Sequence, residues 1–164
     1  DPACPSPGAV ATFRIVAGSD ALAAAPGSPA DALGEWPGPL VFSADGSRLV
    51  VASQCAPFSA CAGQASLTAF AVDPATAVLV PPAAGVLPLS GLAVTALAMA
   101  PSGRALYAVS PCADPACAGP GTLNVFAVDG AGALALQASS PHPAGVGGRV
   151  VVAAGAPFDP VAPI

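Results

Sequence analysis

Five cysteines are the residues of this chain whose spacing points most directly to chemistry. Cys55 and Cys61 enclose five residues, and Cys112 and Cys117 enclose four. A zinc site needs four converging ligands, but the chain has a single histidine, and a redox pair usually has the tighter C-x-x-C spacing. We therefore predict two local disulfides, Cys55 with Cys61 and Cys112 with Cys117, which would make the protein secreted or exposed at the cell surface.

Cys4 is left over from these two pairs. Asp1-Pro-Ala-Cys4 matches Asp114-Pro-Ala-Cys117, so the partner of Cys4 should lie five or six positions before residue 1. The sequence then predicts either a fragment of a longer polypeptide or a disulfide to another chain, with a free thiol as the third alternative.

Acid-base catalysis has few candidate residues in this sequence. The histidine, His142, lies in a Ser-Pro-His-Pro segment, where we expect a surface or linker role, and Glu35 is the only glutamate. Four aspartates lie at turns, where binding backbone N–H groups explains them: Asp45, Asp73, Asp129 and Asp159. We identify no catalytic, cofactor-binding or metal-binding residue, which favours a role other than that of an enzyme without deciding the question.

Other binding functions have weak support. Trp36 could stack on a sugar, but a linker tryptophan covering the edge of a sheet is the simpler interpretation. The only asparagine, Asn124, is not in a sequon, whereas serines beside prolines would allow O-linked sugar. Lysine is absent and four arginines are scattered, which excludes a nucleic-acid surface: Arg14, Arg48, Arg104 and Arg149. No apolar run is long enough for a membrane-spanning helix.

The composition favours short strands over helices. Charged residues make up only 8% of the 164 residues and the net charge is −5. Apolar residues reach 54%, but 41 of them are alanines. With 21 prolines and 18 glycines, the chain cannot form long helices and is predicted to be a single all-β domain.

An internal repeat organises the chain. Residues 40–53 recur at 97–110, and the match continues through the cysteines to residues 66–73 and 122–129. A third copy is divided between the two ends, because residues 11–16 resemble the end of this unit and residues 148–158 resemble its beginning. We predict that the two terminal pieces complete one repeat unit between copies of the chain, or continue into further units of a longer polypeptide, through Phe13, Ile15, Val150, Val151 and Val152.

Each repeat of about 57 residues predicts four short antiparallel strands. In the first, apolar runs at 40–43, 49–52, 67–72 and 77–80 are separated by turn residues. Within 67–72, Phe70 and Val72 point to one face and Leu67, Ala69 and Ala71 to the other, so both faces should be covered. Sheets stacked face to face, as in a β-propeller, meet that requirement.

These residues resemble a known repeat. The segment 42–52, the Phe-Ala-Val-Asp segments ending at Asp73 and Asp129, and the segment 140–145 are similar to the lactonase-like seven-bladed β-propeller family. The resemblance implies blades at 39–94 and 95–145, with partial blades at 1–38 and 146–164. It is carried by structural motifs, and the cysteine loops and the small number of blades depart from the family.

We therefore expect a disulfide-stapled, extracellular structural or assembly protein whose partners are copies of itself or further blades of the same polypeptide. Completion of a blade head-to-tail would give a ring or a filament. The first alternative is a fragment of a lactonase-like enzyme, and the second is a carbohydrate-binding propeller, which would need exposed aromatic residues repeated in each blade.

Overall fold

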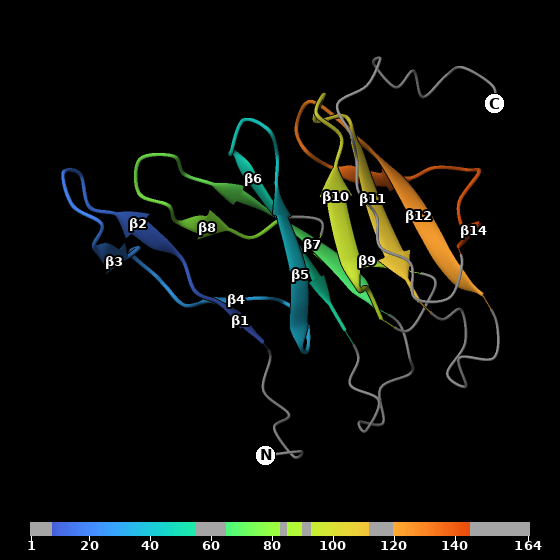
Figure 1. Cartoon of the computed structure of the whole chain (residues 1–164), viewed down its shortest axis with the longest axis horizontal. Helices are drawn as coiled ribbons and strands as arrows, with labels where there is room; N and C mark the ends of the chain where they lie inside the picture. The colour runs from blue at the N-terminus through green and yellow to red at the C-terminus, as the bar shows by residue number, and fades with distance from the viewer. Residues whose placement is uncertain (1–7, 55–64, 83–84, 90–92, 112–119, 145–164) are drawn as a thin grey trace.

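The structure, a computed structural model, describes residues 8–54, 65–82, 85–89, 93–111 and 120–144. These residues form short β-strands joined by turns and loops, with no helix among them (Figure 1). In this part of the chain, no helix is therefore long and apolar enough to cross a membrane. The cysteines and Val150 to Val152 lie outside the described residues, and so does Asp159.

The first full blade is one antiparallel sheet spanning residues 37–88. The strand order is β5, β6, β7 and β8, and β9 also pairs with β7, so that β8 and β9 share the outer position. Two prolines, Pro81 and Pro82, separate these outer strands, and proline cannot donate to a strand ladder. The strands are β5 (Pro37–Phe42), β6 (Arg48–Ser53), β7 (Ser66–Val72), β8 (Leu79–Val80) and β9 (Leu87–Pro88).

The second full blade repeats this arrangement at residues 96–144. Its order is β10, β11, β12 and β13, and β14 also pairs with β12. His142, expected at a surface or linker position, is half-buried in the outer strand β14, opposite Leu123. The strands are β10 (Ala96–Met99), β11 (Ala105–Ser110), β12 (Gly121–Val128), β13 (Leu134–Leu136) and β14 (His142–Ala144).

An N-terminal half-blade precedes the two full blades. It consists of β1 (Ala9–Val10) paired with β4 (Ala30–Asp31), and β2 (Phe13–Ile15) paired with β3 (Leu22–Ala24). The backbone N–H of Thr12 donates to Ser28 Oγ at 2.9 Å, as that of Val125 donates to Ser140 Oγ at 2.8 Å. This shared contact aligns β1 and β2 with β12, so the half-blade corresponds to the outer two strand positions of a full blade.

The core lies between the stacked sheets (Figure 1). On one side of the first full blade, Leu49, Val51 and Phe70 pack against Val10 and Ala32 of the half-blade segment. On its other side, a cluster joins it to the second full blade: Val50, Ala52, Leu67, Leu106, Ala108 and Phe126. The prediction that both faces of the strand at 67–72 are covered is confirmed, and so are the four antiparallel strand positions of each full blade.

Candidate functional site

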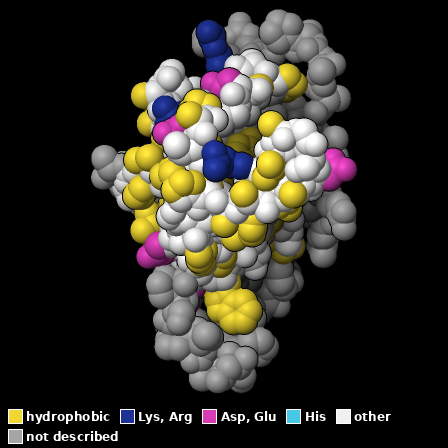
Figure 2. Space-filling model, turned by 90° about the vertical axis from the view of Figure 1, so that its left-hand side faces the viewer, with side chains coloured by type: hydrophobic (Ala, Val, Ile, Leu, Met, Phe, Trp, Pro, Cys, Tyr) yellow, Lys and Arg dark blue, Asp and Glu magenta, His cyan; other side chains and the backbone are white. Residues whose placement is uncertain are grey.

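The face of the half-blade turned away from the first full blade is apolar and exposed. Phe13 is 55% exposed, although its equivalents Phe70 and Phe126 are 1% and 0% exposed. Ile15 is 75% exposed and lies opposite Leu22, which is 64% exposed. Figure 2 views the molecule from this side and shows hydrophobic side chains reaching the surface. The predicted blade-completion residues Phe13 and Ile15 therefore belong to one uncovered apolar face.

The half-blade also has an open strand edge. In the first full blade, β7 pairs with β6 on one side and with β8 and β9 on the other. The corresponding β1 and β2 pair only with β4 and β3 within the described residues. Their other edge presents backbone donors and acceptors to which a further strand could bind.

A layer of buried polar side chains recurs at one end of both full blades. Ser53 and Thr68 occupy it in the first, and Ser110 and Asn124 occupy the same register positions in the second. The hydroxyls of Ser53, Thr68 and Ser110 are buried and make no hydrogen bond with the described residues. Because an unsatisfied buried hydroxyl costs free energy, this layer is a structural polar seam that an ordered water could bridge.

The turns at the opposite end of the full blades contain three aspartates, Asp45, Asp73 and Asp129. Hydrogen bonds from Ser43 Oγ, from the backbone N–H of Ser47 and from Ser47 Oγ lower the pKa of Asp45 to about 2. Backbone N–H groups of Ala75 and Thr76 lower the pKa of Asp73 in the same way. These carboxylates are ionised turn residues, as the sequence predicts, and are poor proton donors.

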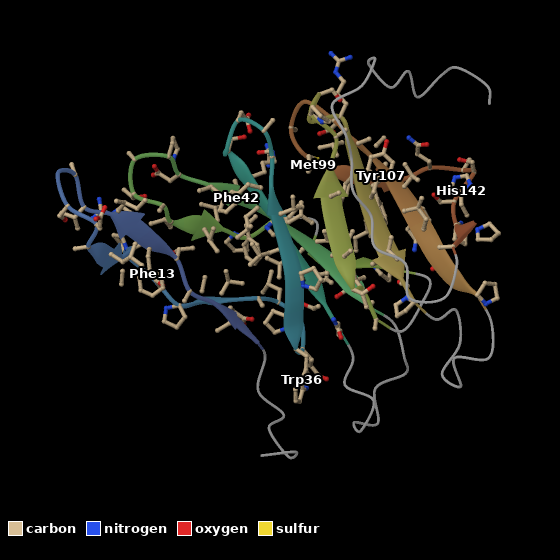
Figure 3. The ribbon with its side chains drawn as sticks, viewed as in Figure 1. Phe13, Trp36, Phe42, Met99, Tyr107 and His142 are labelled. Atoms are coloured by element: carbon tan, nitrogen blue, oxygen red, sulfur yellow. The ribbon has the colours of Figure 1, made fainter. Side chains whose placement is uncertain are left out.

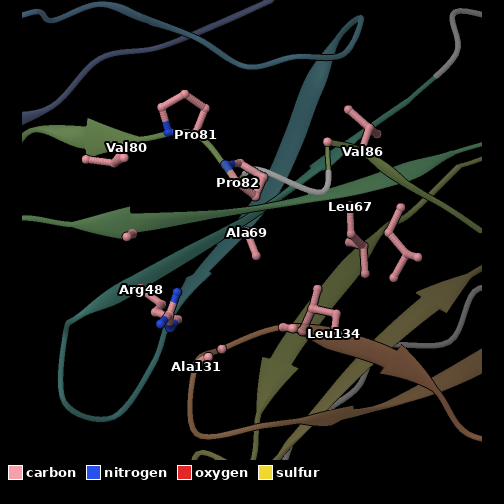
Figure 4. Close-up of a pocket in the computed structure, with 14 residues that line it drawn as sticks. Arg48, Leu67, Ala69, Val80, Pro81, Pro82, Val86, Ala131 and Leu134 are labelled. Carbon is pink, nitrogen blue, oxygen red and sulfur yellow. The ribbon is translucent and has the colours of Figure 1, made fainter.

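Two adjoining cavities meet at Arg48. The first, of about 320 Å³, is a mostly apolar groove between the outer strands of the first full blade and the β12–β13 hairpin of the second. The second, of about 540 Å³, is lined by the polar blade turns and includes Asp45, Arg104 and Asp129. Figure 4 shows Arg48 at one side of the groove, close to Ala131 of the hairpin.

The residues considered for sugar binding and catalysis do not converge. Trp36 is 53% exposed at one end of β5, and its counterpart in the second repeat is Ala93. Figure 3 places Trp36, Phe13 and His142 far apart on the molecule. Among the described residues, no group of three metal-ligating side chains gathers. These positions do not form a sugar platform repeated in each blade.

Arg48 is the site residue that sequence reasoning missed, because the four arginines were considered only as a scattered set. The alignment of the repeats contained a signal. Arg48 of the first repeat corresponds to Ala105 of the second. At this position, a small side chain faces the place of the following blade. The first repeat therefore has a long, positively charged side chain between blades where the second has alanine. This difference between the repeats is the signal that points to Arg48.

The comparisons with known proteins support the architecture. No protein-family model and no curated protein matches this sequence. Among solved structures, this chain is similar to putative 6-phosphogluconolactonases from Bacteroides fragilis (TM-score 0.60, 19% identity) and Bacteroides uniformis (TM-score 0.61, 17% identity). The likeness covers 85% of this chain in both cases.

This chain spans only about a third of the solved structures it resembles, 34% and 36% of their lengths. At such low sequence identity the likeness concerns the fold. The predicted resemblance to the lactonase-like propeller is therefore confirmed as an architecture of stacked antiparallel blades.

Proposed function

We propose that this chain is a segment of a lactonase-like β-propeller enzyme, to which it contributes two full blades and the outer half of another. The observation that carries the proposal is the exposure of Phe13, because its equivalents Phe70 and Phe126 are buried where a preceding sheet covers them. The likeness to longer lactonase-like structures supports the same interpretation and favours an enzyme fragment over a purely structural protein.

The described residues serve this enzyme as a framework. Opening a lactone requires groups that polarise the carbonyl and activate water. The acidic residues of the described turns are engaged by their own backbones, and His142 lies within the edge strand β14. In our proposal, the reactive groups come from outside the described residues and the blades hold them in place.

The test compares the 164-residue chain with the complete polypeptide encoded by its gene. Both are assayed in a pH-stat against aliphatic and sugar lactones, since ring opening releases a proton. We expect the complete polypeptide to hydrolyse lactones. Its Ile15→Arg variant should hydrolyse them at least about tenfold more slowly, and its Arg14→Gln variant should keep the native rate. Ile15 lies on the uncovered face, whereas Arg14 is exposed on the other face of the same strand. A complete, folded polypeptide that opens none of these lactones would overturn the enzyme proposal.

Head-to-tail assembly is a second candidate, supported by the open edge of β1 and β2 beside the exposed Phe13. In this case the residues from Val150 to Val152 of one copy would pair with that edge in the next copy. The predicted pairs Cys55 with Cys61 and Cys112 with Cys117 would staple an extracellular assembly, and Cys4 would link neighbouring copies.

Light scattering after size-exclusion chromatography tests the assembly. We expect oligomers of the unreduced chain that grow with concentration, dissociate in Ile15→Arg and in Val151→Pro, and persist in Arg14→Gln. Intact mass measured without reduction would show the two predicted local disulfides and the fate of Cys4. A chain that stays monomeric at every concentration would eliminate this candidate, and it would leave the enzyme proposal to be decided by the lactone assay.

A further inference from the structure

Arg48 is a cation held at the boundary between two full blades. It is the first residue of β6, and it shares the strand face of Val50 and Ala52, which pack against the second full blade. The side chain is half-buried and lies against Gly132, where a Cβ atom would be 1.7 Å from Arg48 Nε. A glycine at this turn therefore leaves the space that Arg48 occupies.

Among the described residues, no side chain or backbone group accepts a hydrogen bond from the guanidinium of Arg48, and no carboxylate forms an ion pair with it. Two carboxylates line the adjoining polar cavity, but Asp45 accepts hydrogen bonds within its own turn and Asp129 accepts the backbone N–H of Ala133. A partly desolvated guanidinium in this position favours an anionic partner.

The groove next to Arg48 is suited to an apolar body. Leu67, Ala69 and Ala71 of β7 line it on one side, and the hairpin residues 131–134 line it on another. Proline and valine side chains form a further wall (Figure 4). Arg48 is the single charged side chain among the described residues that line this groove of about 320 Å³, a volume within the range of small-ligand sites.

We propose that this groove binds a small monocarboxylate with an apolar body, such as a medium-chain fatty acid. The apolar chain lies against Ala69 and Ala71, and the carboxylate pairs with the guanidinium of Arg48. The negative charges of Asp45 and Asp129 in the adjoining cavity oppose the higher charge of a phosphate monoester. The chemistry therefore selects a single carboxylate over a phosphate.

An NMR titration of the ¹⁵N-labelled 164-residue chain with octanoate tests the proposal. We expect saturable shifts at residues 67–71 and 131–134, and binding at least about tenfold weaker in Arg48→Gln, since a hydrogen-bonded charge is lost. Arg48→Lys, which keeps the charge, should retain part of the affinity. Arg104→Gln, which alters the other arginine of the polar cavity, should change the affinity less than about twofold.

Two further probes separate the charge from the apolar chain. Octan-1-ol should bind native protein and Arg48→Gln equally, and octyl phosphate should bind more weakly than octanoate. Ala71→Leu, which fills the groove, should weaken both octanoate and octan-1-ol. The proposal fails if native protein and a folded Arg48→Gln bind octanoate equally, if octyl phosphate binds more tightly than octanoate, or if no saturable shift occurs at the groove.

Discussion

Phenylalanine truncation at equivalent positions of the repeat tests how the blades stabilise one another. Phe70 and Phe126 are 1% and 0% exposed, so Phe70→Ala and Phe126→Ala should each lower the free energy of unfolding by about 3–5 kcal/mol, the cost of emptying a packed core site. Phe13 is 55% exposed and buries less than half of its surface. At roughly 1.5–3 kcal/mol for complete burial, Phe13→Ala should cost about 1 kcal/mol.

Urea unfolding of the 164-residue chain, followed by far-ultraviolet circular dichroism at low protein concentration, measures these differences. The three variants remove the same atoms at equivalent register positions, so the burial of the ring is the variable. If Phe13→Ala costs as much as Phe70→Ala, the ring of Phe13 is covered and the uncovered face is refuted. A cost for Phe13→Ala that rises with protein concentration would instead show that a second copy covers the ring.

Three smaller perturbations test the turns and the outer strands. Because the folded pKa of Asp45 is about 2, below the ordinary 3.8, this group stabilises the fold above about pH 4 and its contribution is lost as the pH falls towards 2. Urea midpoints measured from pH 5 to 2 should therefore fall less steeply in Asp45→Asn, and equal slopes would contradict the turn geometry. Gly132→Ala should lower the free energy of unfolding by about 1–2 kcal/mol, because the φ of Gly132 is +82° and the added Cβ would meet the side chain of Arg48. Gly130 has open space around it, so Gly130→Ala should change the free energy of unfolding by less than about 1 kcal/mol. Similar costs in both glycine variants, read from urea midpoints, would remove the argument for that contact. Ser140→Ala leaves the buried backbone N–H of Val125 without its side-chain acceptor and should cost about 1–3 kcal/mol by the same measurement; native stability would contradict a role for this contact.

The repeat in the sequence predicts the blade architecture because turn chemistry and apolar alternation coincide. Asp45 with Gly46 forms one such turn, and Phe70 and Leu67 lie on opposite apolar faces as the alternation requires. The divided outer strands were not predicted. Their interruption depends on side chains that replace ladder contacts, such as Ser140 Oγ, and on Pro81 and Pro82, which no period-two pattern reveals.

The candidate sites were predictable only in part. Phe13 and Ile15 could be identified from the divided repeat, since a sequence that supplies half of a blade must leave one apolar face without its usual neighbour. Arg48 could not, because its environment is created by Gly132, which is 84 positions away in the chain and belongs to another blade. A site formed between two blades can be identified only when the structure shows which sheet faces are in contact.

The polar seam of Ser53 and Ser110 has an evolutionary consequence. Both full blades present the same order of layers to their predecessors, an aromatic ring followed by a polar seam, so this part of the interface is interchangeable, whereas the contact of Arg48 with Gly132 belongs to one pair of blades. An in-frame duplication or loss of one repeat would therefore place compatible surfaces in contact. At these two layers, a change in blade number by recombination would need no new interface.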